Sequence, residues 1–274
     1  MKRLLLLINF ILALLLTGCV IPAKGREEKT TEEIVLAASS GTDPYDDINQ
    51  YIKEATPGNA AKKKSGSVSN SESSFNYSDI PEYSGEPYIV VNNDRPYFTE
   101  EMLTTDCYQD YGTLDELGRT PATTIVTCYE ELPSGERGEI GHIKPSGFKQ
   151  KKYPGIVDSD PPYLYNRAHL GMWAMLGDKS NVPENLISGS RYFNTESMLP
   201  NETIVLNYIK ESKQHILYRV TPIYIEDDLV ARGVLMEAMS IEDKGESLSL
   251  CRWAYNVQPG IKIDYKTGES ELEK

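Results

Sequence analysis

Three side chains within residues 169–202 have the types that metal-assisted hydrolysis requires. His169 carries an imidazole that can accept a proton near neutral pH. Asn194 offers a neutral amide oxygen and Glu202 a carboxylate, and hard cations accept such oxygens directly or through their waters. Each also has an ordinary structural explanation: a satisfied histidine, a cap or turn residue, and an acid that complements a helix dipole. The chemical interpretation therefore depends on their occurrence together.

Two segments around these residues carry the most specific pattern. Residues 163–170 read Tyr-Leu-Tyr-Asn-Arg-Ala-His-Leu, and residues 185–194 read Asn-Leu-Ile-Ser-Gly-Ser-Arg-Tyr-Phe-Asn. They resemble the DNA/RNA non-specific endonuclease family, in particular its DNA-entry nuclease branch. The resemblance extends over most of the chain beyond its N-terminal part, through residues 92–93, 144–148, 218–222, 256–260 and 264–268.

The resemblance implies a ββα-metal (His-Me finger) motif with an Asp-Arg-Gly-His signature. It places His169 at the general base, Asn194 at the protein ligand of the metal and Glu202 at a catalytic carboxylate that supports the metal-bound waters. Asn185 joins this catalytic group as a site-supporting residue. The implied reaction is hydrolysis of phosphodiesters in DNA, with RNA left open, to 5′-phosphate ends, using Mg²⁺ or another divalent cation such as Mn²⁺.

Two positions depart from the signature. Asn166 stands in place of its Asp, and Ala168 in place of its Gly. Asparagine keeps an acceptor oxygen but lacks the charge that raises a neighbour's basicity, and alanine has less access to positive φ than glycine. These departures leave open a rival function: a lipid-anchored protein that binds nucleic acid or surface material without cutting it.

The acidic net charge is unfavourable for binding nucleic acid, so binding would require positively charged side chains near the site. The formal net charge is −13 and the pI about 4.8, whereas proteins that neutralise many phosphates are usually basic. Residues 144–152 nevertheless contain four lysines and no acid, a run that could also be a solvated loop. We expect contacts to phosphate and sugar rather than to base edges. The candidate substrate-binding side chains are Arg167, which could also be a structural brace, Arg191, Lys149 and Lys151.

The elements that must position these residues indicate an α+β domain with an antiparallel sheet core. Strand-like runs occur in residues 87–98, 123–129 and 252–258, and residues 215–224 and 229–238 form a hairpin around the polar turn at 226–228. One helix is predicted in which Asn201 is the cap and Glu202 lies in the first turn. Its expected apolar stripe consists of Ile204, Val205, Tyr208 and Ile209. Arg219 and Arg232, on predicted strands, are expected to form salt bridges.

The N-terminus predicts export and lipid attachment. Residues 1–18 combine a basic start, an apolar run too short to span a bilayer and a Leu-Thr-Gly ending before Cys19. This ending resembles the bacterial lipobox, which implies that Cys19 anchors the protein to the membrane outside the cytoplasm. Residues 19–86, poor in large apolar side chains, are predicted to be a disordered tether, and residues 87–274 the endonuclease domain. No protein partner is predicted.

Three cysteines follow the anchor: Cys107, Cys128 and Cys251. In an exported domain, one disulfide and one free thiol is the simplest arrangement. The chain has no Cys-x-x-Cys pair and only three histidines, so the spacing does not predict a zinc site. Of those histidines, His142 and His215 are expected to be non-catalytic.

Overall fold

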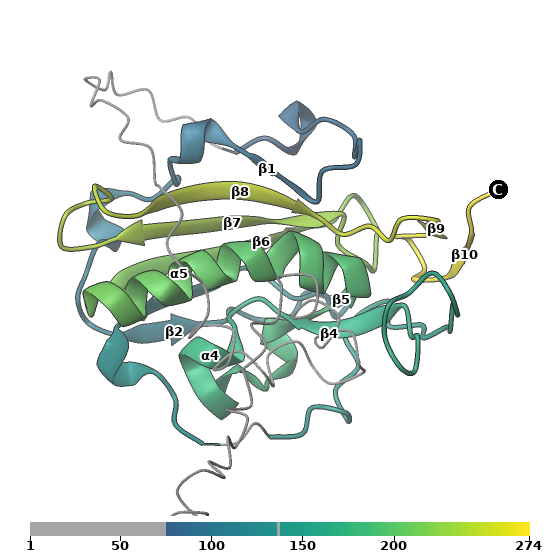
Figure 1. The fold of residues 1–274 in the computed structure, drawn as a ribbon, viewed down its shortest axis with the longest axis horizontal. Coiled ribbons are helices and arrows are strands. Elements are labelled where there is room, and N and C mark those ends of the chain that lie inside the picture. Colours follow the sequence, from purple (N-terminus) through teal and green to yellow (C-terminus); the bar gives the residue numbers. More distant parts are fainter. Residues whose placement is uncertain (1–74, 136–137) are drawn as a thin grey trace, which may run out of the picture. The chain divides into compact units, whose positions relative to one another are not determined.

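The computed structural model describes residues 75–135 and 138–274, and Figure 1 shows their arrangement. The predicted signal peptide, the lipid-anchor residue Cys19 and most of the predicted tether lie outside these residues. Within the described part of the chain, no helix is both long enough and apolar enough to pass through a bilayer.

Six antiparallel strands form the main sheet, in the spatial order β1-β8-β7-β6-β3-β2. The strand runs expected near residues 87–98, 123–129, 215–224, 229–238 and 252–258 all lie in this sheet, which confirms the α+β class with an antiparallel core. The central strand β7 is buried on both faces, because β6 and β8 flank it and the core elements cover the sheet. The strands are β1 (Tyr88–Val90), β2 (Tyr108–Asp110), β3 (Thr123–Thr127), β6 (Ile216–Ile223), β7 (Gly233–Ser240) and β8 (Ser249–Tyr255).

Two hairpins stand apart from the main sheet. In the first, β4 (Tyr165–His169) pairs antiparallel with β5 (Leu186–Ser190), so that His169 faces Leu186 across the ladder. In the second, β9 (Ile261–Ile263) pairs with β10 (Ser270–Leu272) near the C-terminus. The first hairpin therefore contains most of both sequence segments that carry the family resemblance.

One long helix follows β5, and it begins earlier than the sequence predicted. A π-helical segment, η7 (Phe193–Met198), continues directly into α5 (Leu199–Ser212). Pro200 accounts for this irregularity, because it has no N–H to donate to the preceding turn. The N–H of Leu199 instead bonds to the carbonyl of Asn194, five residues earlier, which is the π-helical pattern.

The predicted cap of this helix is wrong. Asn201 lies inside the helix, where its Nδ2 donates to the carbonyl of Ser197 at 2.8 Å. The capping contact comes from Ser190, whose Oγ accepts from the N–H of Phe193 at 2.9 Å. The buried stripe also differs: Ile204 is 39% exposed, and the face toward the sheet is formed by Leu199, Glu202, Val205, Leu206 and Ile209.

The remaining helical segments are short and lie in the connections. The turn after β1 takes positive φ at Asn92, Asn93 and Asp94, as asparagine and aspartate tolerate. These segments are η1 (Tyr77–Asp79), η2 (Asn92–Asp94), η3 (Glu100–Met102), η4 (Tyr129–Glu131), α4 (Trp173–Leu176), η5 (Gly177–Ser180) and η6 (Pro183–Asn185).

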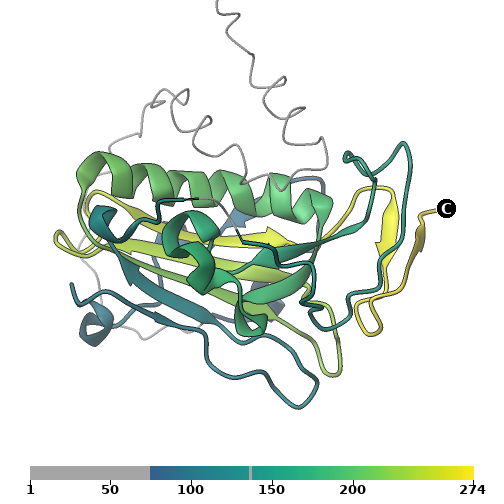
Figure 2. The same cartoon turned by 90° about the horizontal axis from the view of Figure 1, so that it is seen from below.

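The helix α5 lies along one face of the main sheet, as Figures 1 and 2 show. On this face the core joins α5, the β4–β5 hairpin and α4 to strands β3, β6, β7 and β8. Burial of these apolar side chains is the main force that holds the hairpin and the helix together. Representative members of this core are Ala168, Met175, Ile187, Leu206, Tyr218 and Met236.

The folded domain extends further toward the N-terminus than the predicted boundary at residue 87. Phe75 stacks on Trp253 with ring centroids 6.1 Å apart, and Tyr77 packs on the same indole at 5.3 Å. Tyr83 contacts Tyr255 edge to face at 5.6 Å. These aromatic side chains bind residues 75–86 to strand β8, so this part of the predicted tether belongs to the domain.

Candidate active site

The hairpin and the helix that follows it form a continuous ββα unit. His169 is the last residue of β4, Asn194 the second residue of η7 and Glu202 the fourth of α5. Their exposed fractions are 1%, 3% and 0%, so all three point into the protein. The fold therefore brings the predicted base, metal ligand and carboxylate onto the elements that the resemblance implied.

The π-helical segment affects how Asn194 and Glu202 face. Eight residues of regular α-helix turn about 80° past two full turns, which would separate the two side chains around the axis. A π segment turns less per residue and reduces that offset. Glu202 is fully buried on the side of the helix that faces the sheet. Burial raises the pKa of Tyr218 on β6 well above the usual value, and the nearby Glu202 raises it further. Asn194 and Glu202 are accordingly both on the buried side of the helix.

The imidazole of His169 is oriented by a chain of polar contacts. Its Nε2 lies 3.1 Å from Oδ1 of Asn181. The Nδ2 of Asn181 donates to Oδ1 of Asp178 at 3.1 Å, and a carboxylate can only accept, so the amide oxygen must face the histidine. Nε2 then carries the proton in the neutral ring, and Nδ1 carries the lone pair. This network selects Nδ1 as the nitrogen that can act as a base.

Asn185 is a structural centre of the loop that follows His169. Its Oδ1 accepts from Thr123 Oγ1 at 3.0 Å and Gly171 N–H at 2.7 Å, and its Nδ2 donates to the carbonyls of Gly171 and Ser180 at 2.8 and 2.9 Å. The side chain is fully buried, and its hydrogen-bonding capacity is used within the protein. Asn185 therefore fixes the loop that carries Asn181, and it acts as a positioning residue.

The turn before Asn194 is held by the segment that ends β8. The Oδ1 of Asn256 accepts from Ser190 N–H at 2.9 Å, and its Nδ2 donates to the carbonyls of Ser188 and Ala231 at 3.0 and 2.9 Å. The Oε1 of Gln258 accepts from Tyr192 N–H at 3.0 Å. These contacts explain why residues 256–260 belong to the resembling pattern, although the sequence did not reveal their role.

Replacement of Asn256 by alanine is expected to lower the free energy of unfolding by about 3 kcal/mol, because it leaves three buried backbone groups without their partner. Urea denaturation followed by circular dichroism measures this loss. Asn166→Ala is the matched control, since Asn166 is half-buried and its side chain makes no hydrogen bond within residues 75–135 and 138–274. A loss below about 1 kcal/mol for Asn256→Ala would contradict the proposed anchoring.

The departure at Ala168 is accommodated by a neighbour without a side chain. Ala168 is fully buried on β4. A Cβ placed on Gly189 of β5 would lie 2.8 Å from the Cβ of Ala168 and 2.6 Å from Cδ1 of Phe193. The absence of a side chain at Gly189 thus leaves the room that the extra methyl group at Ala168 occupies. The other departure, Asn166, pairs with Gly189 across the hairpin.

Three of the four predicted phosphate-binding cations, Arg167, Lys149 and Lys151, contact groups of the protein itself. Arg167 donates to the carbonyls of Ile143 and Gly141, the latter at 2.7 Å, and stacks on Phe148 at 4.6 Å, which favours its role as a brace. Burial lowers its pKa below the usual value. Arg191 is 5% exposed at the turn between β5 and η7, where its backbone N–H bonds to Leu164.

The two lysines lie beside the C-terminal hairpin. Lys149 pairs with Glu269 at 3.0 Å, and Lys151 donates to the carbonyl of Ser270 at 3.0 Å. The backbone of Lys151 bonds to Leu164, just before β4, so both lysines flank the strand end opposite His169, about 13 Å away along the strand. The expected salt bridges of Arg219 with Glu237 (2.7 Å) and Arg232 with Asp228 (2.6 Å) are confirmed.

Solved structures share this fold at low sequence identity. NucA from Streptococcus agalactiae with magnesium bound superposes with a TM-score of 0.58 at 21% identity, covering 69% of this chain and 91% of its own. The same nuclease without metal gives 0.60 at 20% identity, with 72% and 92% covered. Sda1 nuclease with bound zinc gives 0.51 at 24% identity, with 61% and 81% covered. No curated protein sequence matches the chain.

The solved structures show a shared fold, and a family model shows the family to which the chain belongs. The model described as DNA/RNA non-specific endonuclease matches residues 101–242, just over half of the 274-residue chain. The matched range contains the entire β4–β5–α5 unit together with strands β2, β3, β6 and β7. The protein therefore belongs to the DNA/RNA non-specific endonuclease family, and it is an endonuclease.

Proposed function

We propose that the protein hydrolyses phosphodiester bonds of DNA, and of RNA as a second substrate to be tested, without sequence preference and with a divalent cation. The observation that carries this proposal is the ββα unit, in which His169 on β4, Asn194 on η7 and Glu202 on α5 are all buried. A non-specific enzyme needs contacts to phosphate and sugar rather than to base edges. The acidic net charge does not oppose this function where a cation supplies the charge at the scissile phosphate.

The side chains fit a hard cation such as Mg²⁺. Among the described residues, the carboxamide of Asn194 makes no hydrogen bond, although the residue is only 3% exposed. A buried amide oxygen of this kind suits a cation that retains several waters, and the Glu202 carboxylate would hold those waters. When bound, the cation would neutralise charge on the phosphate and on the leaving oxygen. The structurally similar NucA from Streptococcus agalactiae has been solved with a magnesium ion bound.

The protein's own part in the reaction centres on His169. In the tautomer that Asn181 favours, Nδ1 takes a proton from the attacking water, and Nε2–H stays bonded to the amide oxygen. The resulting imidazolium is stabilised by that contact and by Asp178 behind Asn181. Asn185 and the loop it anchors keep the ring in position. Asn166, in place of the signature Asp, makes none of these contacts within the described residues.

We also propose that the enzyme works outside the cytoplasm, attached to the membrane through a lipid on Cys19. The proposal rests on the basic, apolar and lipobox-like order of residues 1–19. Phase partition into a detergent layer tests it: the full chain should enter that layer and Cys19→Ala should not. Partition of the variant equal to that of the parent would contradict the anchor.

Digestion of plasmid DNA and of a structured RNA by the purified full chain tests the reaction class. With Mg²⁺ we expect cleavage at many sites and 5′-phosphate ends, and with EDTA a loss of cleavage by at least about 100-fold. The rival function, binding without cutting, predicts a mobility shift of DNA without cleavage in Mg²⁺ or Mn²⁺. Intact DNA across several divalent cations, with the protein folded, would overturn the proposed nuclease activity.

A further inference from the structure

A second group of metal-ligand side chains lies away from the ββα unit, at one end of three neighbouring strands. Cys107 precedes β2, Cys128 follows β3 and His215 precedes β6. The order β6-β3-β2 and the antiparallel registers, which pair Tyr108 with Val126 and Thr127 with Ile216, bring these three positions together. The two sulfur atoms and one imidazole nitrogen all lie within 4.8 Å of one another.

The distance between the sulfur atoms suits a tetrahedral ion. The Sγ atoms of Cys107 and Cys128 are 3.8 Å apart. Two thiolates bound to zinc at about 2.3 Å in tetrahedral geometry stand about 3.8 Å from each other. Sulfur and imidazole ligands select zinc-class cations, whereas the amide and carboxylate of the ββα unit suit Mg²⁺.

The histidine of this group has the partner that metal-binding histidines usually have. Its Nδ1 lies 2.7 Å from Oε1 of Glu242, and the same carboxylate accepts from the backbone N–H of His215 at 3.0 Å. A carboxylate on one ring nitrogen fixes the tautomer and leaves the other nitrogen with its lone pair for a cation. Glu242 thus holds the imidazole of His215, for which the sequence predicted no catalytic role, beside the two cysteines.

Zinc-class cations bind cysteine as the thiolate, so binding of such a cation would release the two thiol protons to solvent.

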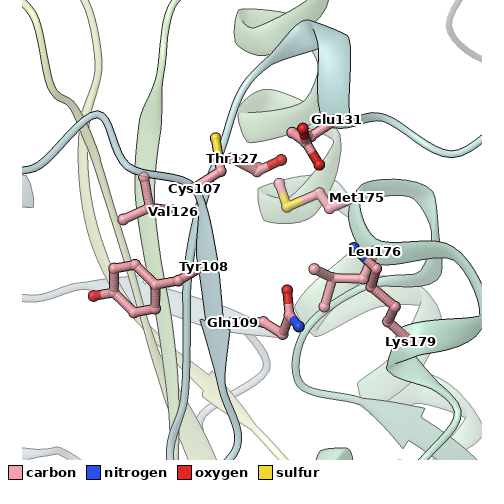
Figure 3. Close-up of a pocket in the computed structure, with 9 residues that line it drawn as sticks. All are labelled: Cys107, Tyr108, Gln109, Val126, Thr127, Glu131, Met175, Leu176 and Lys179. Carbon is pink, nitrogen blue, oxygen red and sulfur yellow. The ribbon is translucent and has the colours of Figure 1, made fainter.

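The group is open to solvent on the side of Cys107. Cys107 stands at one end of a hollow of about 70 Å³ between β2 and the α4–η5 segment, with Lys179 at the opposite side. Figure 3 shows the cysteine beside Thr127 and Glu131 at the end of this hollow. Cys107 is exposed, while Cys128 is buried behind it. A cation can thus reach the buried thiol through the side on which Cys107 lies.

We propose that Cys107, Cys128 and His215 bind one zinc-class divalent cation, with Glu242 orienting the imidazole. The site is structural: it ties together the ends of β2, β3 and β6, and it fixes the start of β6 directly after α5. It is independent of the cation proposed at Asn194, and the two sites are distinguished by their ligand chemistry.

The test uses the reduced, metal-free full chain with excess Mg²⁺ present, titrated with Zn²⁺ against a chromophoric chelator. We expect one Zn²⁺ per chain, a Zn²⁺-dependent rise in melting temperature and, with Co²⁺, the thiolate charge-transfer absorption of a tetrahedral site. Cys107→Ser and His215→Ala should each weaken Zn²⁺ binding by about 100-fold or more, and Glu242→Gln by about 10-fold. Cys107 is exposed, so its serine variant should fold.

Cys251→Ser is the matched control, because Cys251 lies buried on β8, away from this group, and its variant should bind Zn²⁺ as the parent does. Equal Zn²⁺ affinity in Cys107→Ser and the parent would overturn the proposal. So would peptide mass spectrometry showing a Cys107–Cys128 disulfide in the exported protein together with no Zn²⁺ binding after reduction. None of these measurements depends on nuclease activity.

Discussion

Replacement of His169 by alanine is expected to lower the rate of DNA cleavage by about 10²–10⁴-fold, the usual contribution of a general base. The physical reason is that Nδ1 is the lone-pair nitrogen of a buried ring whose Nε2 is engaged by Asn181. The measurement is the initial rate of plasmid nicking at saturating Mg²⁺. Added imidazole should restore part of the rate to His169→Ala, because it can enter the vacated space and accept the proton.

The matched control for this prediction is His142→Ala. His142 is exposed in the loop before residues 144–148, so its removal should change the rate less than about twofold and leave the fold intact. The melting temperatures of both variants should be measured first, since His169→Ala also removes one hydrogen bond, a loss of about 1 kcal/mol. Cleavage by folded His169→Ala at the rate of the parent would exclude His169 as the base.

Replacement of Asn194 by alanine is expected to abolish cleavage at low Mg²⁺ and to raise the Mg²⁺ concentration for half-maximal rate by at least about 10–100-fold. The amide of Asn194 makes no hydrogen bond within the described residues, so its removal should cost little stability. The loss would therefore reflect the missing cation ligand. Asn194→Asp, which keeps an oxygen at the same position, should retain metal-dependent cleavage.

The control for Asn194 is Asn207→Ala, a second asparagine of the same helix on its partly exposed side. Its variant should show the Mg²⁺ dependence of the parent. Rates measured across Mg²⁺ and Mn²⁺ concentrations separate weaker cation binding from misfolding, because the former is overcome by more cation. An unchanged Mg²⁺ dependence in Asn194→Ala would remove Asn194 from the proposed cation site.

The two variants together also distinguish the nuclease from the rival that binds without cutting. If both fold and bind DNA like the parent but fail to cleave it, the ββα unit performs the chemistry. If the parent itself does not cleave under any divalent cation while binding DNA, the departures at Asn166 and Ala168 mark a degenerate site.

Much of the fold could be predicted from local pattern. Alternating apolar residues predicted strands β6 and β8, and apolar runs predicted β3 and β7, because such local patterns are a property of the chain itself. The helix boundary could not be predicted, because the cap is Ser190, eleven residues before the predicted Asn201, and Pro200 is accommodated by a π-helical segment. The domain boundary was misplaced because Phe75 and Tyr77 are held by Trp253, far along the chain.

Part of the candidate site could likewise be predicted from the sequence, and part could not. The sequence alone predicted His169, Asn194 and Glu202 as site residues, because their types and their spacing along the chain resemble the family pattern. Only the tertiary structure decided that Arg167 braces a loop, that Lys149 and Lys151 contact the C-terminal hairpin, and that Asn256 holds the turn before Asn194.

The cysteines show the physical reason for this division most clearly. Their spacing predicted no metal site, because a zinc pattern is recognised in sequence only when its ligands are close along the chain. Strand pairing brought Cys107, Cys128 and His215 within 4.8 Å although they are far apart in sequence. Residue types and local periodicity can be read from the sequence, whereas contacts between distant segments arise from the burial and hydrogen bonding of the whole domain.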